Sequence, residues 1–511
     1  MNNRLEFDSL EKYSTLDKNK EYFLLPFNFN RFDSNKYLLV NDLGKYIFLE
    51  KNLFHDFVNK KLKINSDIYF DLKSKKFLVD NQTSFLKNQF ISEYQTKKSF
   101  LINSRKLHIF VVSLRCDHSC PYCQVSRQSE DKDKYDMNEE IAKKSIDLAL
   151  AHPSRDMTFE FQGGEALLNF EIIQYIVSYT KSKNEIFKKN IDFVICTNLS
   201  TLSNDHLDFI KDHEIKVSTS LDGPEYIHDK NRPFGRKSSY NTVVANLKKA
   251  QEALGKHYVS ALMTTTKNSL GFSKEIVDEY IKLGLGSIFL RSLSPYGFAV
   301  KTKKAIGYDA YDFVKFYIET LDYILKLNKE GQVFPEAYTS ILLKKILTPF
   351  PVGYVDLASP AGAGFNVVVY NYDGDVYASD ESRMLAEMGD KTFRIGNVVT
   401  DTYDEIFFGK DLQTISKFSC NESLQGCDSC VFQSFCGADP VYHYATQKDM
   451  YGNRANSDFC KKNYSIINHL FKIIKDQDDD VMRILFSWIY NDDHENLKVD
   501  FKKWQQTTQY V

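Results

Sequence analysis

The chain has 511 residues, enough for about three domains of ordinary size. Hydrophobic residues make up 43% of it, so each domain can bury a core and a disordered chain is excluded. Lys and Arg (66) nearly balance Asp and Glu (68), which excludes the broad positive footprint of a nucleic-acid binder. The first residues, Met1 to Tyr13, carry charges where a signal peptide has its apolar core, and no segment reaches about 18 consecutive apolar residues. We therefore expect a cytoplasmic protein without a membrane or nucleic-acid partner.

Residues 1–95 are predicted to hold a small separate unit and the start of a linker. The apolar runs Lys36 to Asn41 and Lys45 to Glu50 are divided by Asp42-Leu43-Gly44, which predicts a β-hairpin. Two segments with helical spacing of apolar residues follow the hairpin, at Leu53 to Leu62 and Ile68 to Leu78. The polar stretch from about Asp80 to Ser104 lacks strong periodicity and is interpreted as the linker.

Residues 96–348 show short β-rich runs that alternate with amphipathic helices, which predicts βα units and a parallel sheet. Six strands are predicted, at Lys106 to Leu114, Met157 to Phe161, Asp192 to Thr197, Lys216 to Ser220, His257 to Thr265 and Ser287 to Arg291. Candidate helix ends are the N-caps Asn138, Ser203 and Ser273 and the C-terminal stop Gly284. Six consecutive βα units favour an α/β fold with an open, partial (β/α)6 TIM barrel.

Helical patterns at Tyr308 to Asn328 and Pro335 to Leu347 end the barrel region. Residues 349–465 are rich in turns and cysteines, and we interpret them as a separate domain. The remaining residues, 466–511, form a tail with a helical period from Ile466 to Tyr490 and a charged end. The expected order is therefore a small N-terminal unit, a barrel, a cysteine-rich domain and a helical tail.

Nine cysteines in a chain without an export signal fit thiols and metal ligands better than a disulfide framework. The segment Cys116-Asp-His-Ser-Cys120-Pro-Tyr-Cys123 directly follows the first barrel strand, at the end where such barrels place their active sites. Three thiolates can hold three irons of a [4Fe-4S] cluster and leave the fourth iron open. Structural zinc normally has four ligands, so a zinc site here would also need His118.

The cysteine loop resembles the CxxxCxxC motif of the radical SAM superfamily. The resemblance implies that the open iron binds the amino and carboxylate groups of S-adenosylmethionine. It also implies that the reduced cluster cleaves this cofactor to a 5′-deoxyadenosyl radical, which takes a hydrogen atom from the substrate. A flavodoxin or ferredoxin would supply the electron. Tyr122, just before the third cysteine, stands where the family places the adenine ring.

Other strand ends match the same family. Phe161-Gln-Gly163-Gly164-Glu165 resembles its GGE motif, in which the glycines let backbone approach the ligand and the carboxylate binds the methionine amino group. Asn198 and Ser220 end the third and fourth strands, where the family contacts the ribose and carboxylate. Ser-Leu-Asp-Gly-Pro at 220–224, followed by Arg232, resembles anaerobic sulfatase-maturating enzymes. Ordinary turn or surface roles are the alternative for Asn198, Ser220 and Arg232.

A second group of cysteines has the spacing of four metal ligands, Cys427, Cys430, Cys436 and Cys460. A zinc ribbon and an auxiliary [4Fe-4S] cluster both accept four thiolates. The run resembles the SPASM domain of peptide-modifying radical SAM enzymes, which usually has seven cysteines and two auxiliary clusters. This chain lacks cysteine at the other ligand positions of that domain. Residues 359–365 contain none, and the two remaining positions are Ser379 and Pro440. We therefore predict one auxiliary cluster, with Cys196 and Cys420 as buried thiols outside it.

Asp380 ends the segment Asp373-Gly-Asp-Val-Tyr-Ala-Ser-Asp380. In the sulfatase-maturating relatives the aspartate at this place takes a proton from the substrate, so the resemblance implies that Asp380 is a general base. Capping of the next helix is the alternative. Three tyrosines are candidates for lining the pocket, with core packing as the alternative: Tyr135, Tyr296 and Tyr377.

Three segments resemble the B-type radical SAM maturases of the His-Xaa-Ser system, at Pro26 to Arg31, 370–381 and 436–445. The likeness runs from about Tyr22 to Cys460. It implies a ribosomally made peptide with His-Xaa-Ser repeats as substrate, a second radical SAM maturase and a small partner protein. The N-terminal unit is similar in outline to a winged-helix element in which a leader peptide adds to a sheet edge. A packing extension of the barrel is the alternative for that unit.

Two other functions stay open. One is a radical SAM enzyme that acts on a small molecule, and the other is a non-catalytic, zinc-stabilised peptide-binding module. Anaerobic metal analysis separates the zinc module from both enzymes, and capture of a neighbouring small peptide separates the two enzymes. The resemblance does not imply which bond is formed in the substrate.

Overall fold

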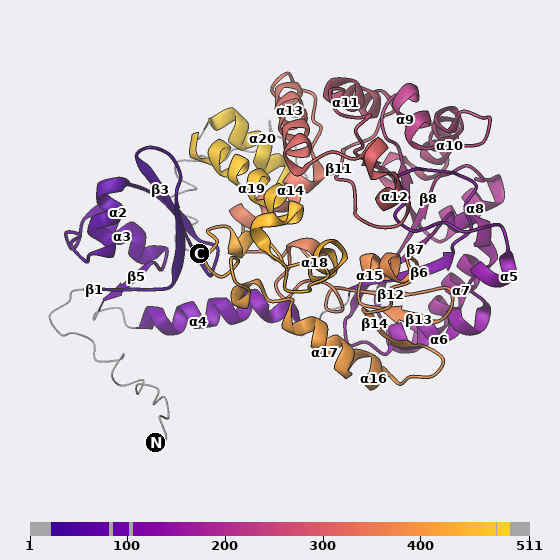
Figure 1. Cartoon of the computed structure of the whole chain (residues 1–511), viewed down its shortest axis with the longest axis horizontal. Helices are drawn as coiled ribbons and strands as arrows, with labels where there is room; N and C mark the ends of the chain where they lie inside the picture. Colours follow the sequence, from indigo (N-terminus) through magenta and orange to yellow (C-terminus); the bar gives the residue numbers. More distant parts are fainter. Residues whose placement is uncertain (1–21, 81–84, 102–105, 477, 491–511) are drawn as a thin grey trace. The chain divides into compact units, whose positions relative to one another are not determined.

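The computed structural model describes residues 22–80, 85–101, 106–476 and 478–490. Two predictions concern residues outside these ranges. They are the absence of a signal peptide at Met1 to Tyr13 and the charged end of the tail. The chain forms two compact units, whose elements are labelled in Figure 1. Of the described residues, the first unit contains 22–98 and the short segment Ser429–Ser434, and the second contains Ser99–Asp428 and 435–490.

The predicted β-hairpin is confirmed in the first unit. Strands β3 (Lys36–Asn41) and β4 (Tyr46–Glu50) pair antiparallel, and Gly44 in the turn has a φ of 81°, which favours glycine. Strand β2 (Phe27–Arg31) pairs with the other side of β3, so the sheet order is β2-β3-β4. The other elements before the linker are α2 (Lys51–Val58), α3 (Asp67–Ser74) and the antiparallel pair β1 (Tyr22–Leu24) and β5 (Leu78–Asp80). Their buried apolar side chains form one core.

The stretch interpreted as a linker contains a helix, α4 (Phe85–Lys98). It has no buried residue, which explains why hydrophobic periodicity gave no signal. Polar contacts tie it to the first unit instead. Lys45 and Lys76 both pair with Glu93, and Lys97 donates a hydrogen bond to the backbone oxygen of Asp42 at 2.9 Å.

The six predicted barrel strands are confirmed, and neighbours pair parallel in chain order. They are β6 (Leu107–Ser113), β7 (Asp156–Gly163), β8 (Asn190–Thr197), β9 (Lys216–Ser220), β10 (Val259–Thr264) and β11 (Leu290–Arg291). The intervening helices surround these strands in Figure 1: α5 (Lys132–Tyr135), α6 (Glu139–Leu150), α7 (Phe170–Phe187), α8 (Asn204–Asp212), α9 (Glu225–Asn231), α10 (Ser239–Leu254) and α11 (Ser273–Lys282).

Asn138 and Ser203 cap α6 and α8 as predicted, because each side chain accepts a hydrogen bond from a backbone N–H of the first turn. The prediction for Ser273 is wrong by one position, since Phe272 is the N-cap of α11. Gly284 has a φ of 70° just after α11, as expected for a helix stop.

The barrel sheet continues past β6 into the cysteine-rich region. Strand β12 (Val367–Tyr370) pairs parallel with β6, and β13 (Asp375–Tyr377) and β14 (Arg394–Asn397) follow antiparallel. The nine-stranded order is β11-β10-β9-β8-β7-β6-β12-β13-β14. The cysteine-rich region therefore shares a sheet with the barrel, which the sequence patterns did not indicate.

The remaining helices complete the second unit. They are α12 (Phe298–Ile306), α13 (Ala310–Lys329), α14 (Ala337–Leu347), α15 (Asp380–Ala386), α16 (Tyr403–Phe408), α17 (Lys410–Lys417), α18 (Pro440–Gln447), α19 (Asp458–Asp476) and α20 (Asp479–Tyr490). The tail helix thus begins at Asp458, before the predicted Ile466, and Cys460 lies in its first turn. None of the helices in the described ranges is long and apolar enough to cross a membrane.

Candidate active site

The cysteine loop leaves the end of β6 and is fixed there by a buried ion pair. Arg115 forms two hydrogen bonds to the Asp136 carboxylate, at 2.7 Å and 2.6 Å, and a third to the backbone oxygen of Leu168 at 2.6 Å. Ser113 donates to the same carboxylate at 2.6 Å. Bidentate pairing of this kind is geometrically specific, so the loop begins from a fixed point directly before Cys116.

Cys116, Cys120 and Cys123 lie on one short loop in a largely buried setting. Burial raises the pKa of Cys116, with a further contribution from the Glu165 carboxylate, and raises the pKa of Cys120 to about 11. Arg232 acts in the opposite direction on Cys120. Leu293 and Ile306 pack against Cys120 and Cys123. Cys120 is buried and Cys116 and Cys123 are half-buried, and three such thiols beside a guanidinium fit a thiolate-bound metal cluster, because metal binding favours the deprotonated thiols.

Gly163 and Gly164 bring the end of β7 against the backbone of the cysteine loop. A Cβ at Gly163 would lie 2.0 Å from the Ser113 oxygen, and one at Gly164 would lie 2.4 Å from the Arg115 oxygen. The backbone N–H groups of Gly164 and Glu165 donate to these two oxygens at 2.8 Å and 2.7 Å. The absence of a Cβ at both glycines therefore allows the end of β7 to form backbone hydrogen bonds with the start of the cysteine loop.

Replacing Gly164 by alanine is expected to destabilise the second unit by about 1–3 kcal/mol, because backbone atoms of the loop cannot move aside for the added methyl group. Gly286→Ala is the matched control, since a Cβ there would meet no described heavy atom within 4 Å. Urea denaturation followed by circular dichroism measures both variants. Equal stability of the two would contradict the close backbone contact.

Glu165 is fully buried and its carboxylate is held inside the protein. It accepts hydrogen bonds from the Thr197 hydroxyl at 2.5 Å, the Asn198 N–H at 2.6 Å and the Leu167 N–H at 2.9 Å. Burial raises its pKa to about 7, against the lowering effect of these bonds. Glu165 therefore joins the end of β7 to the end of β8.

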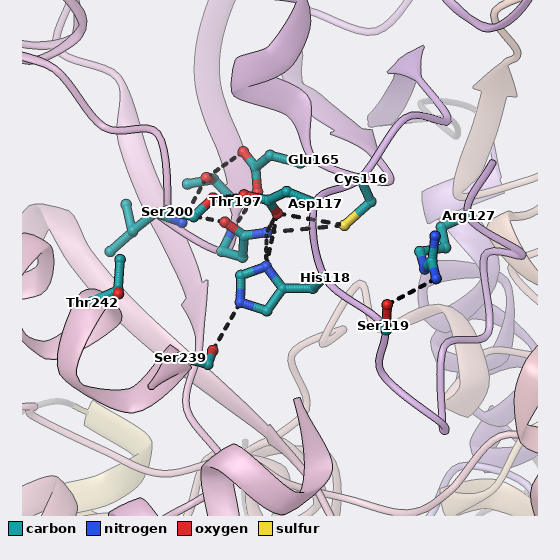
Figure 2. Close-up of polar contacts among 12 residues, drawn as sticks. Cys116, Asp117, His118, Ser119, Arg127, Glu165, Thr197, Ser200, Ser239 and Thr242 are labelled. Carbon is teal, nitrogen blue, oxygen red and sulfur yellow. Dashed lines mark hydrogen bonds and ion pairs between the residues drawn. The ribbon is translucent and has the colours of Figure 1, made fainter. Parts of the chain in front are cut away.

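A network of polar groups connects Asn198 to the cysteine loop. Figure 2 shows the contacts around Asp117 and His118. The Asn198 side-chain amide donates to Asp117 Oδ1 at 2.9 Å and lies 3.9 Å from the Cys116 sulfur. Ser200 donates to the other Asp117 oxygen at 2.5 Å. Burial alone would raise the pKa of Asp117, but its hydrogen bonds with His118, Ser200 and Asn198 lower it to about 2.

His118 is occupied by hydrogen bonding on both ring nitrogens. Nδ1 lies 2.7 Å from Asp117 Oδ1, and Nε2 lies 2.8 Å from the Ser239 hydroxyl. Its ring stacks on Phe234 with centroids 4.5 Å apart. Cys116, Asp117 and His118 do place ligand atoms within 4.8 Å of one another. A histidine ligand needs a free ring nitrogen, however, so this arrangement disfavours the zinc alternative that His118 would have to complete.

Tyr122 and Arg232 meet in a second buried group next to Cys120. The Tyr122 hydroxyl donates to Asp222 Oδ2 at 2.8 Å and accepts from Arg232 Nη1 at 2.6 Å. The guanidinium also lies over the Tyr122 ring, 5.8 Å from its centroid. Ser220, at the end of β9, is two residues before Asp222. Arg232 is 9% exposed, so the alternative of a surface role is wrong for this residue.

The two groups form one continuous network. Ser239 bonds both His118 and His228, and His228 Nδ1 accepts from the Asp222 N–H at 3.2 Å. Sequence reasoning did not assign Asp117, Asp222 or Ser239 to the site. The first two stand inside motifs that were recognised, but no sequence signal marked Ser239, which begins α10.

A cavity of about 290 Å³ lies inside the barrel and reaches into the cysteine-rich region. Leu293 lines it and also packs in the apolar cluster that contains Cys120 and Cys123, so the cavity wall and the cysteine loop share this side chain. Asp380 lines it as well. Of the three candidate tyrosines, Tyr296 lines the cavity, whereas Tyr377 is in the core of β13 and Tyr135 packs near Tyr372.

Asp380 is not the cap of the helix that follows it. Ser379 is the N-cap of α15 and forms a capping box with Ser382, so Asp380 is the first helical residue. Its carboxylate accepts a hydrogen bond from the buried Arg383 at 2.5 Å. This leaves Asp380 fixed at the cavity wall with a cation behind it.

Three of the C-terminal cysteines interact within the second unit. The pKa of Cys427 is raised to about 12, mainly by burial. The charges of Cys436 and Cys460 also raise it. Asn463 donates to the Cys436 sulfur at 3.9 Å. Cys430 belongs to the segment Ser429–Ser434 of the first unit, where its backbone oxygen accepts from Asn28 at 3.1 Å.

The surroundings of Arg454 indicate what kind of group these thiols can bind. It is 7% exposed, and its Nε and Nη2 atoms have no hydrogen-bond partner within the described part of the chain. The guanidinium lowers the pKa of Cys427, Cys436 and Cys460. Buried donors without acceptors beside three thiols fit a negatively charged group bound by those thiols.

Comparisons with known proteins agree with this geometry. The sequence profile of the radical SAM superfamily matches residues 110–294. An uncharacterized protein of Methanocaldococcus jannaschii is 32% identical over 200 residues, which cover 38% of this chain and 65% of that protein. The cysteine-type anaerobic sulfatase-maturating enzyme of Clostridium novyi is 24% identical over 73% of this chain and 99% of its own length.

Solved structures share the fold at low identity. The structure of anSMEcpe with bound AdoMet has a TM-score of 0.61 and 19% identity, covering 76% of this chain and 99% of that one. Streptococcus suis SuiB bound to precursor peptide SuiA has a TM-score of 0.52 and 16% identity, covering 86% of this chain and 99% of that one. These likenesses confirm the predicted fold class.

Proposed function

Residues 110–294 form a radical SAM domain, and we propose that the chain around this domain is an enzyme that modifies a ribosomally made peptide. The observation that carries the proposal is the cavity whose wall shares Leu293 with the cluster around the cysteine loop. It is lined by residues of the barrel strands and by Asp380 of the cysteine-rich region, so a substrate there can meet a proton acceptor and the radical-generating site together.

The radical SAM superfamily uses a [4Fe-4S] cluster and S-adenosylmethionine. When bound, these cofactors supply a 5′-deoxyadenosyl radical that abstracts hydrogen. In this chain Cys116, Cys120 and Cys123 would hold the cluster. Residues proposed to bind S-adenosylmethionine are Tyr122, Gly163, Gly164, Glu165, Asn198, Ser220 and Arg232. Glu165 and Arg232 support this proposal by fixing Asn198 and Tyr122 beside the thiols.

One auxiliary [4Fe-4S] cluster is proposed at the C-terminal cysteines. Cys427, Cys436 and Cys460 interact in the structure, and Cys430 is added as the fourth ligand from the sequence spacing. The orphaned donors of Arg454 support an anionic group at this place. A flavodoxin or ferredoxin would serve as the electron donor.

A peptide substrate is supported by the relatives, because solved neighbours carry a Cp18Cys peptide and the precursor peptide SuiA. We propose a His-Xaa-Ser type peptide as substrate, with a second radical SAM maturase and a small protein as partners. The sheet β2-β3-β4 of the first unit offers an edge strand for a leader peptide.

Asp380 is proposed to take a proton from the substrate. Its carboxylate is held by the buried Arg383, and the residue lines the cavity, where a general base could reach the substrate. Asp380→Asn is expected to lower peptide modification at least about 100-fold while cleavage of S-adenosylmethionine continues uncoupled. Asp390→Asn, outside the cavity lining, is the control.

The measurement is mass spectrometry of the neighbouring small peptide after co-expression, followed by transfer of deuterium from labelled peptide to 5′-deoxyadenosine in vitro. A mass change that requires this protein, and label in 5′-deoxyadenosine, are expected. If no candidate peptide transfers label while a small metabolite does, the peptide proposal fails and the small-molecule enzyme takes its place.

A further inference from the structure

The cavity wall carries more acidic than basic groups. Five carboxylates line it, those of Glu160, Asp356, Asp380, Glu381 and Asp439. Arg291 and Lys462 are the cations among the lining residues. With Arg383, which pairs with Asp380, counted among the cations, the five carboxylates face three cationic groups.

Three of the five carboxylates have partners. Asp380 pairs with Arg383 at 2.5 Å. Asp356 feels the charges of both Lys462 and Arg291. Glu160 accepts a hydrogen bond from the Gln162 side chain at 2.6 Å. Glu381 and Asp439 are the other two carboxylates of the wall.

Glu381 and Asp439 form no ion pair with any described residue. Asp439 accepts one hydrogen bond, from the Tyr442 N–H at 2.8 Å, as the N-cap of α18. Burial raises the pKa of both groups, and the charge of Asp356 raises each further. Removing two such groups from water is costly unless a cation or a donor meets them.

The Tyr296 hydroxyl is another polar group of the cavity wall. Tyr296 is 1% exposed and lines the cavity, and its hydroxyl has no hydrogen-bond partner among the described residues. The negative charges that act on this phenol come from Asp439, Glu381 and Asp356. A buried hydroxyl without a partner, in one cavity wall with two carboxylates that form no ion pair, points to a ligand that donates several hydrogen bonds.

We propose that this cavity binds a cationic side chain of the substrate, an ammonium or guanidinium group that donates to Glu381, Asp439 and the Tyr296 oxygen. The proposal rests on the proposed function in that the cation belongs to the peptide to be modified. The volume of about 290 Å³ suits one long side chain, at the lower end of the range of small-molecule sites. The charges of Arg291 and Lys462 also act on Glu381 and Asp439, respectively, but neither cation forms an ion pair with these two carboxylates among the described residues.

The experiment compares charged and neutral probes of the same shape. Nα-acetyl-arginine amide and Nα-acetyl-citrulline amide are titrated into the reconstituted full-length protein with S-adenosylmethionine, followed by isothermal calorimetry. The lysine and norleucine derivatives form a second pair. At least one charged probe is expected to bind about tenfold or more tightly than its neutral counterpart, as for hydrogen bonds to buried charges.

Glu381→Gln and Asp439→Asn are expected to remove this preference. Glu387→Gln is the matched control, because Glu387 ends the same helix but does not line the cavity. Tyr296→Phe keeps the ring and should weaken the charged probe severalfold, which preserves the test if a carboxylate variant fails to fold. Equal affinities within both pairs, or no binding of either charged probe, would overturn the cation site.

The binding measurement requires neither cleavage of S-adenosylmethionine nor a peptide. A protein that forms no 5′-deoxyadenosine but prefers the charged probe would refute the proposed function and keep the cation site. A protein that modifies its peptide but binds both probes equally would support the proposed function and refute the cation site.

Discussion

A variant with Cys116, Cys120 and Cys123 all replaced by alanine is expected to form no 5′-deoxyadenosine. An open iron can be presented to S-adenosylmethionine only when three thiolates hold the other three irons. The structure places these thiols on one loop whose start is fixed by the Arg115 and Asp136 pair, so no other described cysteine can replace them without refolding the loop. The assay measures 5′-deoxyadenosine by chromatography after reduction with dithionite.

Cys196→Ala is the matched control for the triple variant. Cys196 lies in β8 and is half-buried rather than buried as predicted, and the pKa of its thiol is raised well above the usual value, mainly by removal from water. The control should keep both iron and activity. Reductive cleavage by the triple variant at the rate of the unaltered protein would refute the assignment of the cysteine loop.

The strand ends of the barrel could be predicted because period and motif agree there. Short β-rich runs located all six strands, and the cysteine loop and Glu165 stand at the ends of β6 and β7. Parallel strands bring their carboxyl ends to one edge, so residues far apart in sequence were expected to meet. Asn198 and Arg232 do lie beside the cysteine loop.

What the sequence did not indicate depends on packing between distant segments. Strand β12 joins β6 because the cysteine-rich region adds to the barrel sheet, a pairing that no local pattern encodes. Helix α4 has no buried residue and is held by ion pairs such as that of Lys76 with Glu93. Hydrophobic periodicity therefore could not locate it. Glu381 and Asp439 become cavity residues only when α15 and α18 come together.

Replacing Cys427, Cys430, Cys436 and Cys460 by alanine is expected to lower the iron content of the anaerobically reconstituted protein by about half. Seven cysteines divide into a set of three and a set of four, which predicts two [4Fe-4S] clusters. Cys427, Cys436 and Cys460 interact in the structure, and the buried Arg454 beside them has donors without acceptors. An anionic cluster would accept those hydrogen bonds, whereas neutral thiols leave the guanidinium unpaired.

Cys420→Ala provides the control, because this cysteine lies outside both sets and should leave the iron content unchanged. Iron and zinc are measured by mass spectrometry of the same samples, and the quadruple variant should still cleave S-adenosylmethionine because its cysteine loop is intact. Stoichiometric zinc in the unaltered protein, lost in the quadruple variant, would show a zinc ribbon. Iron sufficient for three clusters would show that ligands other than cysteine fill the positions in 359–365, at Ser379 and at Pro440. Either result would refute the single auxiliary cluster, since that cluster requires four thiolates and no more.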